Sequence, residues 1–149
     1  MSLSTSPQSG LGISLSWKTA SGGTFASLVQ LLDDAEFDGF DTTIINLPTL
    51  AVGTMAKAPG RTDNGTFTGS CYLVFADAGV TELMALGSSK ATIYWQVMLN
   101  DGSSPTTGST YAFQGFISNL KPGNFSGDDA PHLDFTIAIS GAITATAGT

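Results

Sequence analysis

Four segments in the second half of the chain alternate between apolar and polar or mixed side chains with a period of two residues. They span residues 66–75, 91–99, 111–120 and 133–140. This period is typical of a β-strand that buries one face against a core. In the last segment, the residues expected to face the core are Leu133, Phe135, Ile137 and Ile139. Strands of this kind require a sheet with a covered face, and this requirement limits the folds that the chain can adopt.

Further strands are expected in the first half. Segments 13–17, 25–32 and 40–47 alternate or are rich in β-branched residues, so we interpret them as strands. In the later segment at 66–75, one face is expected to be buried, and it consists of Phe67, Gly69, Cys71, Leu73 and Phe75.

One short helix is expected, at about residues 78–86. Asp77 suits the N-cap position and Gly87 suits the residue after the last turn. Between them lies an apolar stripe at helical spacing, formed by Val80, Leu83 and Met84.

The expected fold class is therefore mainly β, with two packed antiparallel sheets, arranged as a sandwich or a partial barrel, and one short flanking helix. The chain has 149 residues, so we expect a single domain over 1–149. Residues 1–12 are expected to form a flexible N-terminal arm. Segments 100–110 and 121–132 are expected to be exposed polar loops.

The segment from Pro48 to Gly65 shows no periodicity. Loops of such length in a compact domain are usually functional or disordered. Within it, "APGRTDNG" (58–65) has the residues of two joined turns: a type II turn at 58–61, with Pro59 and Gly60 at its centre, and a second turn formed by Asp63, Asn64 and Gly65.

Charge and composition exclude several classes of function. Charged residues make up 11% of the chain, well below the roughly 25% of typical domains, which suggests that partners cover part of the surface. The formal net charge of −7 argues against conventional binding of nucleic acid, which needs a positive surface. Cys71 is the single cysteine, so no intrachain disulfide is expected. The first residues do not resemble a signal peptide, and no apolar run is long enough for a membrane helix.

Motifs for site chemistry are weak. "GLG" at 10–12 lacks the third glycine of a dinucleotide fingerprint, and "APGRTDNG" precedes a strand, whereas phosphate loops precede helices. A calcium loop registered on Gly39 would place Ile45 where a glutamate is required. His132 lies near acidic residues but has no accompanying nucleophile motif. We therefore expect no enzymatic activity, no cofactor and no metal site.

Aromatic residues are numerous but not interleaved with basic ones, so core packing is favoured over a stacking platform for bases or sugars. The residues concerned are Trp17, Tyr94, Trp95, Tyr111, Phe113 and Phe116.

The order of segments resembles that of the major tail tube proteins of bacteriophages with long, non-contractile tails. The resemblance rests on "FDTT" before the long loop, "PGRTDNGTFTGSCYLVF", "DAGVTELMAL" before "ATIYWQVMLNDG", "YAFQGFISNL" and "DFTIAISG", and it covers about residues 25–143. It implies a subunit that forms hexameric rings, which stack into a tube through which DNA passes without specific binding. Tube proteins of contractile tails and of type VI secretion are similar in fold. No C-terminal immunoglobulin-like domain is expected.

The resemblance also implies a role for the long loop, residues 48–65, in contacts between subunits. The assembly residues expected are Pro48, Thr49, Leu50, Ala51, Val52, Gly53, Thr54, Met55, Ala56, Lys57, Pro59, Gly60 and Arg61. Lys57 and Arg61 are expected to form salt bridges with Asp38 and Asp41 of a neighbouring subunit. Expected partners are further copies of the chain and the tape measure, terminator and distal tail proteins.

The expected location is the virion tail, after synthesis in the host bacterial cytoplasm. Two alternatives remain open at this point. One is a tail terminator, a neck ring or a secretion-tube protein of similar fold, and the other is a monomeric β-sandwich module that binds carbohydrate.

Overall fold

The structure is a computed structural model that describes residues 13–25, 27–31, 35–48, 53–102, 107–123, 125–128 and 130–149. The expected N-terminal arm, 1–12, lies outside the described residues. So do Thr49, Leu50, Ala51 and Val52 of the expected assembly loop.

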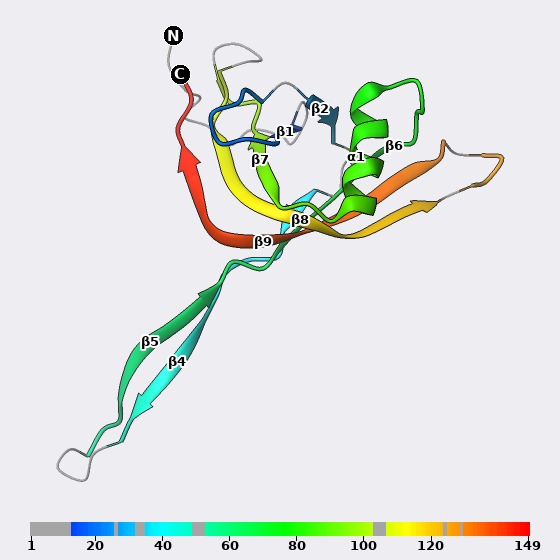
Figure 1. Cartoon of the computed structure of the whole chain (residues 1–149). Helices are drawn as coiled ribbons and strands as arrows, with labels where there is room; N and C mark the ends of the chain where they lie inside the picture. The colour runs from blue at the N-terminus through cyan, green and yellow to red at the C-terminus, as the bar shows by residue number, and fades with distance from the viewer. Residues whose placement is uncertain are drawn as a thin grey trace.

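The described residues form ten elements, which are shown in Figure 1: β1 (Ser14–Lys18), β2 (Ser27–Gln30), β3 (Glu36–Phe37), β4 (Asp41–Leu47), β5 (Ala56–Asp63), β6 (Thr66–Tyr72), α1 (Ala78–Ser89), β7 (Ile93–Met98), β8 (Thr110–Gly123) and β9 (His132–Thr146). Seven strands form one sheet in the order β2-β1-β7-β8-β9-β6-β3, and β4 and β5 form a second. All strand pairs are antiparallel. The fold is thus mainly β, with two antiparallel sheets and one short helix, as predicted.

The large sheet is strongly curved, and the small sheet projects from it as a separate hairpin (Figure 1). The bend coincides with breaks in the pairing of β8 with β9, where Gln114 is opposite Ser140 but Ala112 is opposite Thr144. Such irregularities bend a strand and increase its twist. No described helix is both long and apolar enough to cross a membrane.

The core lies inside this curve. It is built from the apolar residues of the alternating strands and from one face of α1; its fully buried members include Leu15, Trp17, Leu83, Trp95, Ile117, Leu133 and Ile137. Trp17 and Trp95 are directly opposite each other on β1 and β7, with ring centroids 5.6 Å apart. Of the six aromatic residues predicted to pack in the core, Trp17, Trp95 and Phe113 are buried there, and the partly buried Tyr111 packs against it. Tyr94 and Phe116 are only partly buried and do not belong to it.

The expected strand at 66–75 is shorter than predicted. β6 ends at Tyr72, and Leu73 is only partly buried. Phe75, expected to face the core, is 71% exposed. The alternation continues past the strand in the sequence, but the backbone turns toward α1, with Asp77 N–H donating to the Val74 carbonyl at 3.1 Å.

The helix begins where the sequence predicts and ends three residues later. Asp77 caps it by accepting a hydrogen bond from Gly79 N–H at 2.9 Å. Gly87 lies within the helix, so its predicted position beyond the last turn is wrong; Lys90, at φ 57°, is the C-cap. A Cβ at Gly87 would be 2.6 Å from Leu120 Cδ2, so the glycine allows α1 to approach β8 closely.

The polar segment 121–132 was expected to be a loop, but its two ends belong to strands. Lys121, Pro122 and Gly123 pair with Asp134, Leu133 and His132. Backbone pairing with a partner already held in the sheet therefore extends the β8–β9 hairpin beyond the apolar pattern.

Candidate assembly surface

β4 and β5 form a hairpin whose described residues, 41–48 and 53–63, are mostly exposed; we call residues 41–63 the arm. Figure 1 shows that it points away from the large sheet. The sequence predicted β4 but interpreted residues 48–65 as a loop. Residues Ala56–Asp63 instead form β5, with Leu47 opposite Ala56 and Asp41 opposite Asp63.

The predicted type II turn at residues 58–61 is wrong, because Ala58 and Pro59 pair with Ile45 and Ile44 within the strand. The residues suited to a turn are accommodated by a bulge, in which Gly60 and Arg61 are opposite the single residue Thr43. A Cβ at Gly60 would be 2.9 Å from the Thr43 carbonyl oxygen. Proline lacks a backbone donor and is tolerated at edges and bulges of sheets, both of which the arm provides.

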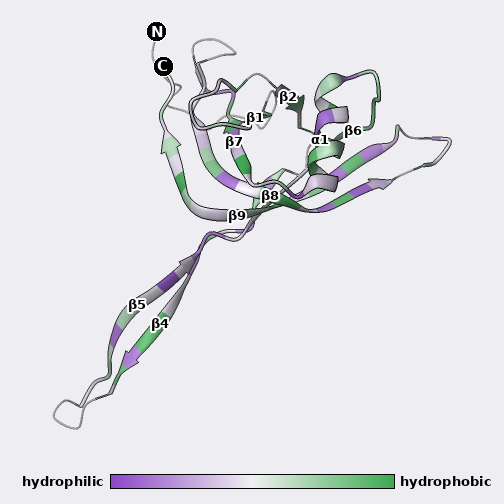
Figure 2. Cartoon of the chain, in the orientation of Figure 1, coloured by the Kyte–Doolittle hydropathy of each residue, from purple (hydrophilic) through white to green (hydrophobic). Residues whose placement is uncertain are grey.

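Apolar side chains occupy both faces of the outer part of the arm. Because paired residues share a face, Ile45 and Leu47 lie with Ala58 and Ala56, whereas Ile44 lies with Pro59 on the other face. Ile44 is 61% exposed and Leu47 is 48% exposed. Figure 2 shows this apolar stretch along β4. A two-stranded hairpin is marginal in water when no core covers it, so this element is suited to burial against another surface.

The charges of the arm are separated along its length. Asp41 and Asp63 are opposite each other at its base, and like charges in such a pair repel. Lys57 is opposite the neutral Asn46, six residues along β5 from Asp63, which corresponds to ~20 Å of strand. Lys57 is therefore out of reach of Asp41 within one arm. Their pairing between subunits stays a prediction.

Asp63, Asn64 and Gly65 connect β5 to β6 at the base of the arm. Gly65, at φ 73°, donates its N–H to Asp63 Oδ1 at 2.9 Å. The Asn64 side-chain amide donates to the carbonyl oxygen of Gly141, the positive-φ glycine in β9. A Cβ at Gly65 would be 2.7 Å from the carbonyl oxygen of Gly39. Gly39 precedes β4 and Gly65 follows β5, so the two ends of the arm lie side by side.

A second exposed apolar surface was missed by the sequence analysis. It lies where the chain leaves β6 and enters α1, and it consists of Tyr72, Val74 and Phe75, all about half exposed or more. We call these three residues the corner. Its signal in the sequence was the helix N-cap at Asp77, which requires the strand to end before residue 77 and so turns these side chains away from the core.

Two carboxylates, those of Asp77 and Asp134, influence Cys71, which lies next to the corner in the chain. Burial, together with the charges of Asp77 and Asp134, raises the pKa of the Cys71 thiol to about 11. Both carboxylates are thus close to Cys71, the residue that precedes Tyr72. Asp134 is exposed on β9, opposite Ser70. The thiol itself is buried and stays protonated at neutral pH, so it is a poor nucleophile.

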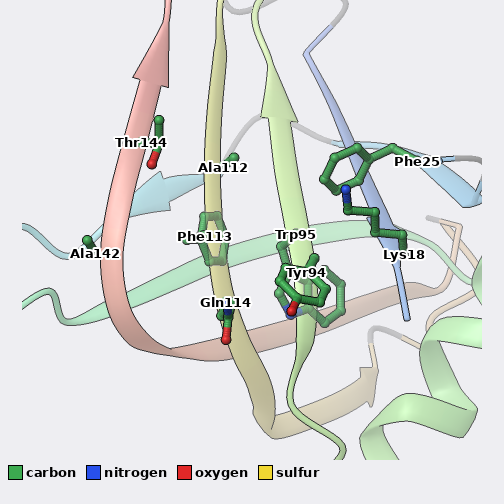
Figure 3. Close-up of a pocket in the computed structure, with 9 residues that line it drawn as sticks. All are labelled: Lys18, Phe25, Tyr94, Trp95, Ala112, Phe113, Gln114, Ala142 and Thr144. Carbon is green, nitrogen blue, oxygen red and sulfur yellow. The ribbon is translucent and has the colours of Figure 1, made fainter. Parts of the chain in front are cut away.

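A small pocket of about 250 Å³ opens beside β7 and β8 (Figure 3). Lys18 Nζ lies 4.5 Å from the centroid of the Phe25 ring and donates to the Ser21 carbonyl at 3.0 Å. Trp95 is buried in the pocket wall, and its Nε1–H donates to the Gly115 carbonyl at 2.9 Å. The large ring is thus committed to the core and is not open for stacking on a sugar.

Among the described residues, no three His, Cys, Asp or Glu side chains gather closely enough to hold a metal ion. His132 lies at the start of β9, with its ring centroid 5.3 Å from that of Tyr72.

No family model matches the sequence, and no curated protein does. Solved structures do match. A chain in the tail of an empty gene transfer agent particle, computed with C6 symmetry, has a TM-score of 0.69 and 15% identity over 95% of this chain and 100% of that chain. A chain of the tail tube of bacteriophage SPP1 has a TM-score of 0.65 and 13% identity, over 95% of this chain and 80% of that chain. A chain in the sheath–tube complex of the extracellular contractile injection system PVC has a TM-score of 0.70 and 14% identity, over 91% of this chain and 88% of that chain. The chain therefore has the fold of tail tube proteins.

Proposed function

We propose that the chain is a structural subunit of a phage-like tail, which assembles into hexameric rings that stack into a tube. The observation that carries the proposal is the arm, an element with apolar side chains on both faces that projects from the subunit. An element of this kind contributes to stability only when another chain covers it. The fold shared with tail tubes supports the same conclusion.

The hexameric ring is supported by the gene transfer agent tail, whose structure has C6 symmetry. Its subunit is covered completely by the superposition. The surface of this chain need not bind DNA for the proposed role. With a net charge of −7, the chain would repel phosphates, which suits a conduit along which DNA moves without adhering.

The proposed role is non-enzymatic, and the proposed location is the tail of the virion, with synthesis in the bacterial cytoplasm. The proposed partners are further copies of the chain along the tube and tape measure, terminator and distal tail proteins at its interior and ends. Assembly is driven by burial of apolar surface, which contributes about 25 cal/mol per Å².

A shortened arm tests the role of this element. Replacement of residues 44–59 by Asn-Gly retains the base of the hairpin, and none of the described residues that it removes belongs to the core. We expect a folded subunit, with an unchanged thermal unfolding midpoint, that forms no tubes in electron micrographs at concentrations at which the parent chain does. Tube growth by the shortened chain would exclude the proposed role of the arm.

A tube terminator is the second candidate. Chains in the terminator structure of the PVC system and in the tube-terminating cap of the anti-feeding prophage both superimpose with a TM-score of 0.72. The same micrographs distinguish the two roles, because a terminator forms single rings that do not stack as the concentration rises. A monomer at every concentration would contradict both candidates.

A further inference from the structure

We propose that the arm of one subunit binds to the corner of the next copy of the chain, so that subunits join head to tail. The inference rests on the proposed self-assembly and adds the surface that receives the arm, namely Tyr72, Val74 and Phe75.

The two surfaces match in polarity. The arm presents Ile44, Ile45 and Leu47, and the corner presents an aromatic ring on each side of Val74. Phe75, at 71%, is among the most exposed large apolar side chains of the described residues. Contact between these surfaces would remove both from water, and exposed aromatic residues are common anchors of interfaces.

The two surfaces also match in charge. Lys57 and Arg61 on β5 are two of the five basic residues of the chain, and both are exposed. Near the corner, Asp77 is two residues after Phe75, and Asp134 is exposed on β9 opposite Ser70; Asp134 is also opposite Lys121 of β8, which offsets part of its charge. Opposite charges at the edge of an apolar contact favour the correct partner and orientation.

The geometry prevents the arm from reaching the corner of its own subunit. β6 begins beside the base of the arm, where the Asp38 N–H donates to the Thr66 carbonyl at 2.8 Å, and it ends at Tyr72. Its seven residues separate the base from the corner by ~20 Å. The arm points away from the sheet that carries the corner (Figure 1). The contact is therefore between different patches on two copies, and contacts of this type generate rings or filaments.

Cross-linking tests this contact directly. One preparation carries Leu47→Cys and another carries Phe75→Cys; the two are mixed under assembly conditions and treated with a short bismaleimide. We expect a covalent dimer that contains one chain of each type. Cys71 contributes little background because it is buried.

Phe125→Cys is the matched control for Phe75→Cys. Phe125 is as exposed, at 73%, but lies in the turn between β8 and β9. A mixture of Leu47→Cys and Phe125→Cys should give at most a tenth of the product. Equal yields from the two mixtures, or a predominant dimer between two Leu47→Cys chains, would overturn the inference in favour of another contact.

Charge exchange gives a second measurement. Lys57→Glu with Arg61→Glu should prevent tube growth, whereas Lys90→Asn, which removes a basic charge outside the arm and suits the left-handed C-cap of α1, should not. Adding Asp134→Lys to the double variant should restore growth at least in part; Asp77 is left intact because it caps α1. Failure of Asp134→Lys to restore any growth would contradict the corner as the receiving surface.

The parent chain separates the two hypotheses. If it forms tubes but the Leu47→Cys and Phe75→Cys mixture gives no product, the corner inference is wrong and the proposed function stands. If the parent chain forms neither rings nor tubes, both are wrong.

Discussion

At the scale of single residues, Gly87 shows how packing can override the local signals of a helix. Alanine is favoured over glycine within a helix by about 1 kcal/mol. A Cβ here would, however, be 2.6 Å from Leu120 Cδ2 and 3.3 Å from Leu120 Cβ. Leu120 Cδ2 is the end of a side chain and can rotate away, but Leu120 Cβ is fixed by the backbone of β8. Overpacking typically costs about 1–3 kcal/mol, and we expect this cost to exceed the gain in helix propensity.

We therefore expect Gly87→Ala to lower the free energy of unfolding by about 1 kcal/mol. Ser88→Ala, at the next and exposed position of α1, is the control and should change it by less than about 0.5 kcal/mol. Urea denaturation of both variants measures the difference. A Gly87→Ala variant as stable as the parent would show that β8 adjusts to the added methyl group at no cost.

Asp101 links the loop before β8 to the chain after β9. Its Oδ1 accepts a hydrogen bond from Ser109 N–H at 2.7 Å, and its Oδ2 accepts one from Ser109 Oγ at 2.8 Å. Ser109 Oγ in turn accepts one from Gly148 N–H at 3.0 Å. The two bonds from Ser109 lower the pKa of Asp101 from its ordinary value of 3.8.

Because the pKa is lower in the folded state, this carboxylate stabilises the fold above about pH 3.8 and loses its contribution as the pH falls through the lowered value. We expect Asp101→Asn to reduce the thermal unfolding midpoint at pH 7, and the difference from the parent chain to shrink below pH 4. Thermal scans at a series of pH values measure this. A difference that is constant from pH 7 to pH 3 would contradict the assignment.

At the scale of elements, the arm differs from every other hairpin of the described structure because both its faces are exposed. β8 and β9 are longer, but they bury alternate residues against α1 and the core. Backbone hydrogen bonds that lack such cover open readily. The arm is thus the element whose stability should depend most on assembly.

Hydrogen exchange can measure this dependence. In the free subunit, amides of β4 and β5 should exchange much faster than those of α1 and β7. On assembly, the arm should gain at least tenfold protection, whereas buried strands such as β7 should change little. Arm amides that are equally protected in both states would show that the hairpin is stable without a partner.

At the scale of the whole molecule, the structure separates a part that forms the core from an exposed part, the arm, for which we propose a role in association. The core gathers residues from β1, β2, β6, β7, β8, β9 and α1. None of the described residues of the arm belongs to that core. The arm projects from one end of β6, and the corner lies at the other end of this strand. A subunit with complementary surfaces at its two ends can extend in one direction, as a tube requires.

Much of this organisation could be predicted from the sequence. The alternation in segments 91–99, 111–120 and 133–140 gives β7, β8 and β9, because burial of one face imposes a period of two on the side chains. Asp77 marks the start of α1, because the N-cap interaction is local. The turn at Asp63–Gly65 is likewise a local matter of backbone conformation.

The surfaces proposed to bind were decided by tertiary structure. β5, "AKAPGRTD", has no alternation and contains proline and glycine, and it is a strand because β4 pairs with it through a bulge. Phe75 continues an apolar pattern but is exposed, because α1 requires the chain to turn after Tyr72. The sequence alone determined most of the buried strands and the N-cap of α1, whose energetics are local or repeat along the chain. Pairing between distant segments determined the arm and the corner, since the partner of a strand is not encoded in the strand itself.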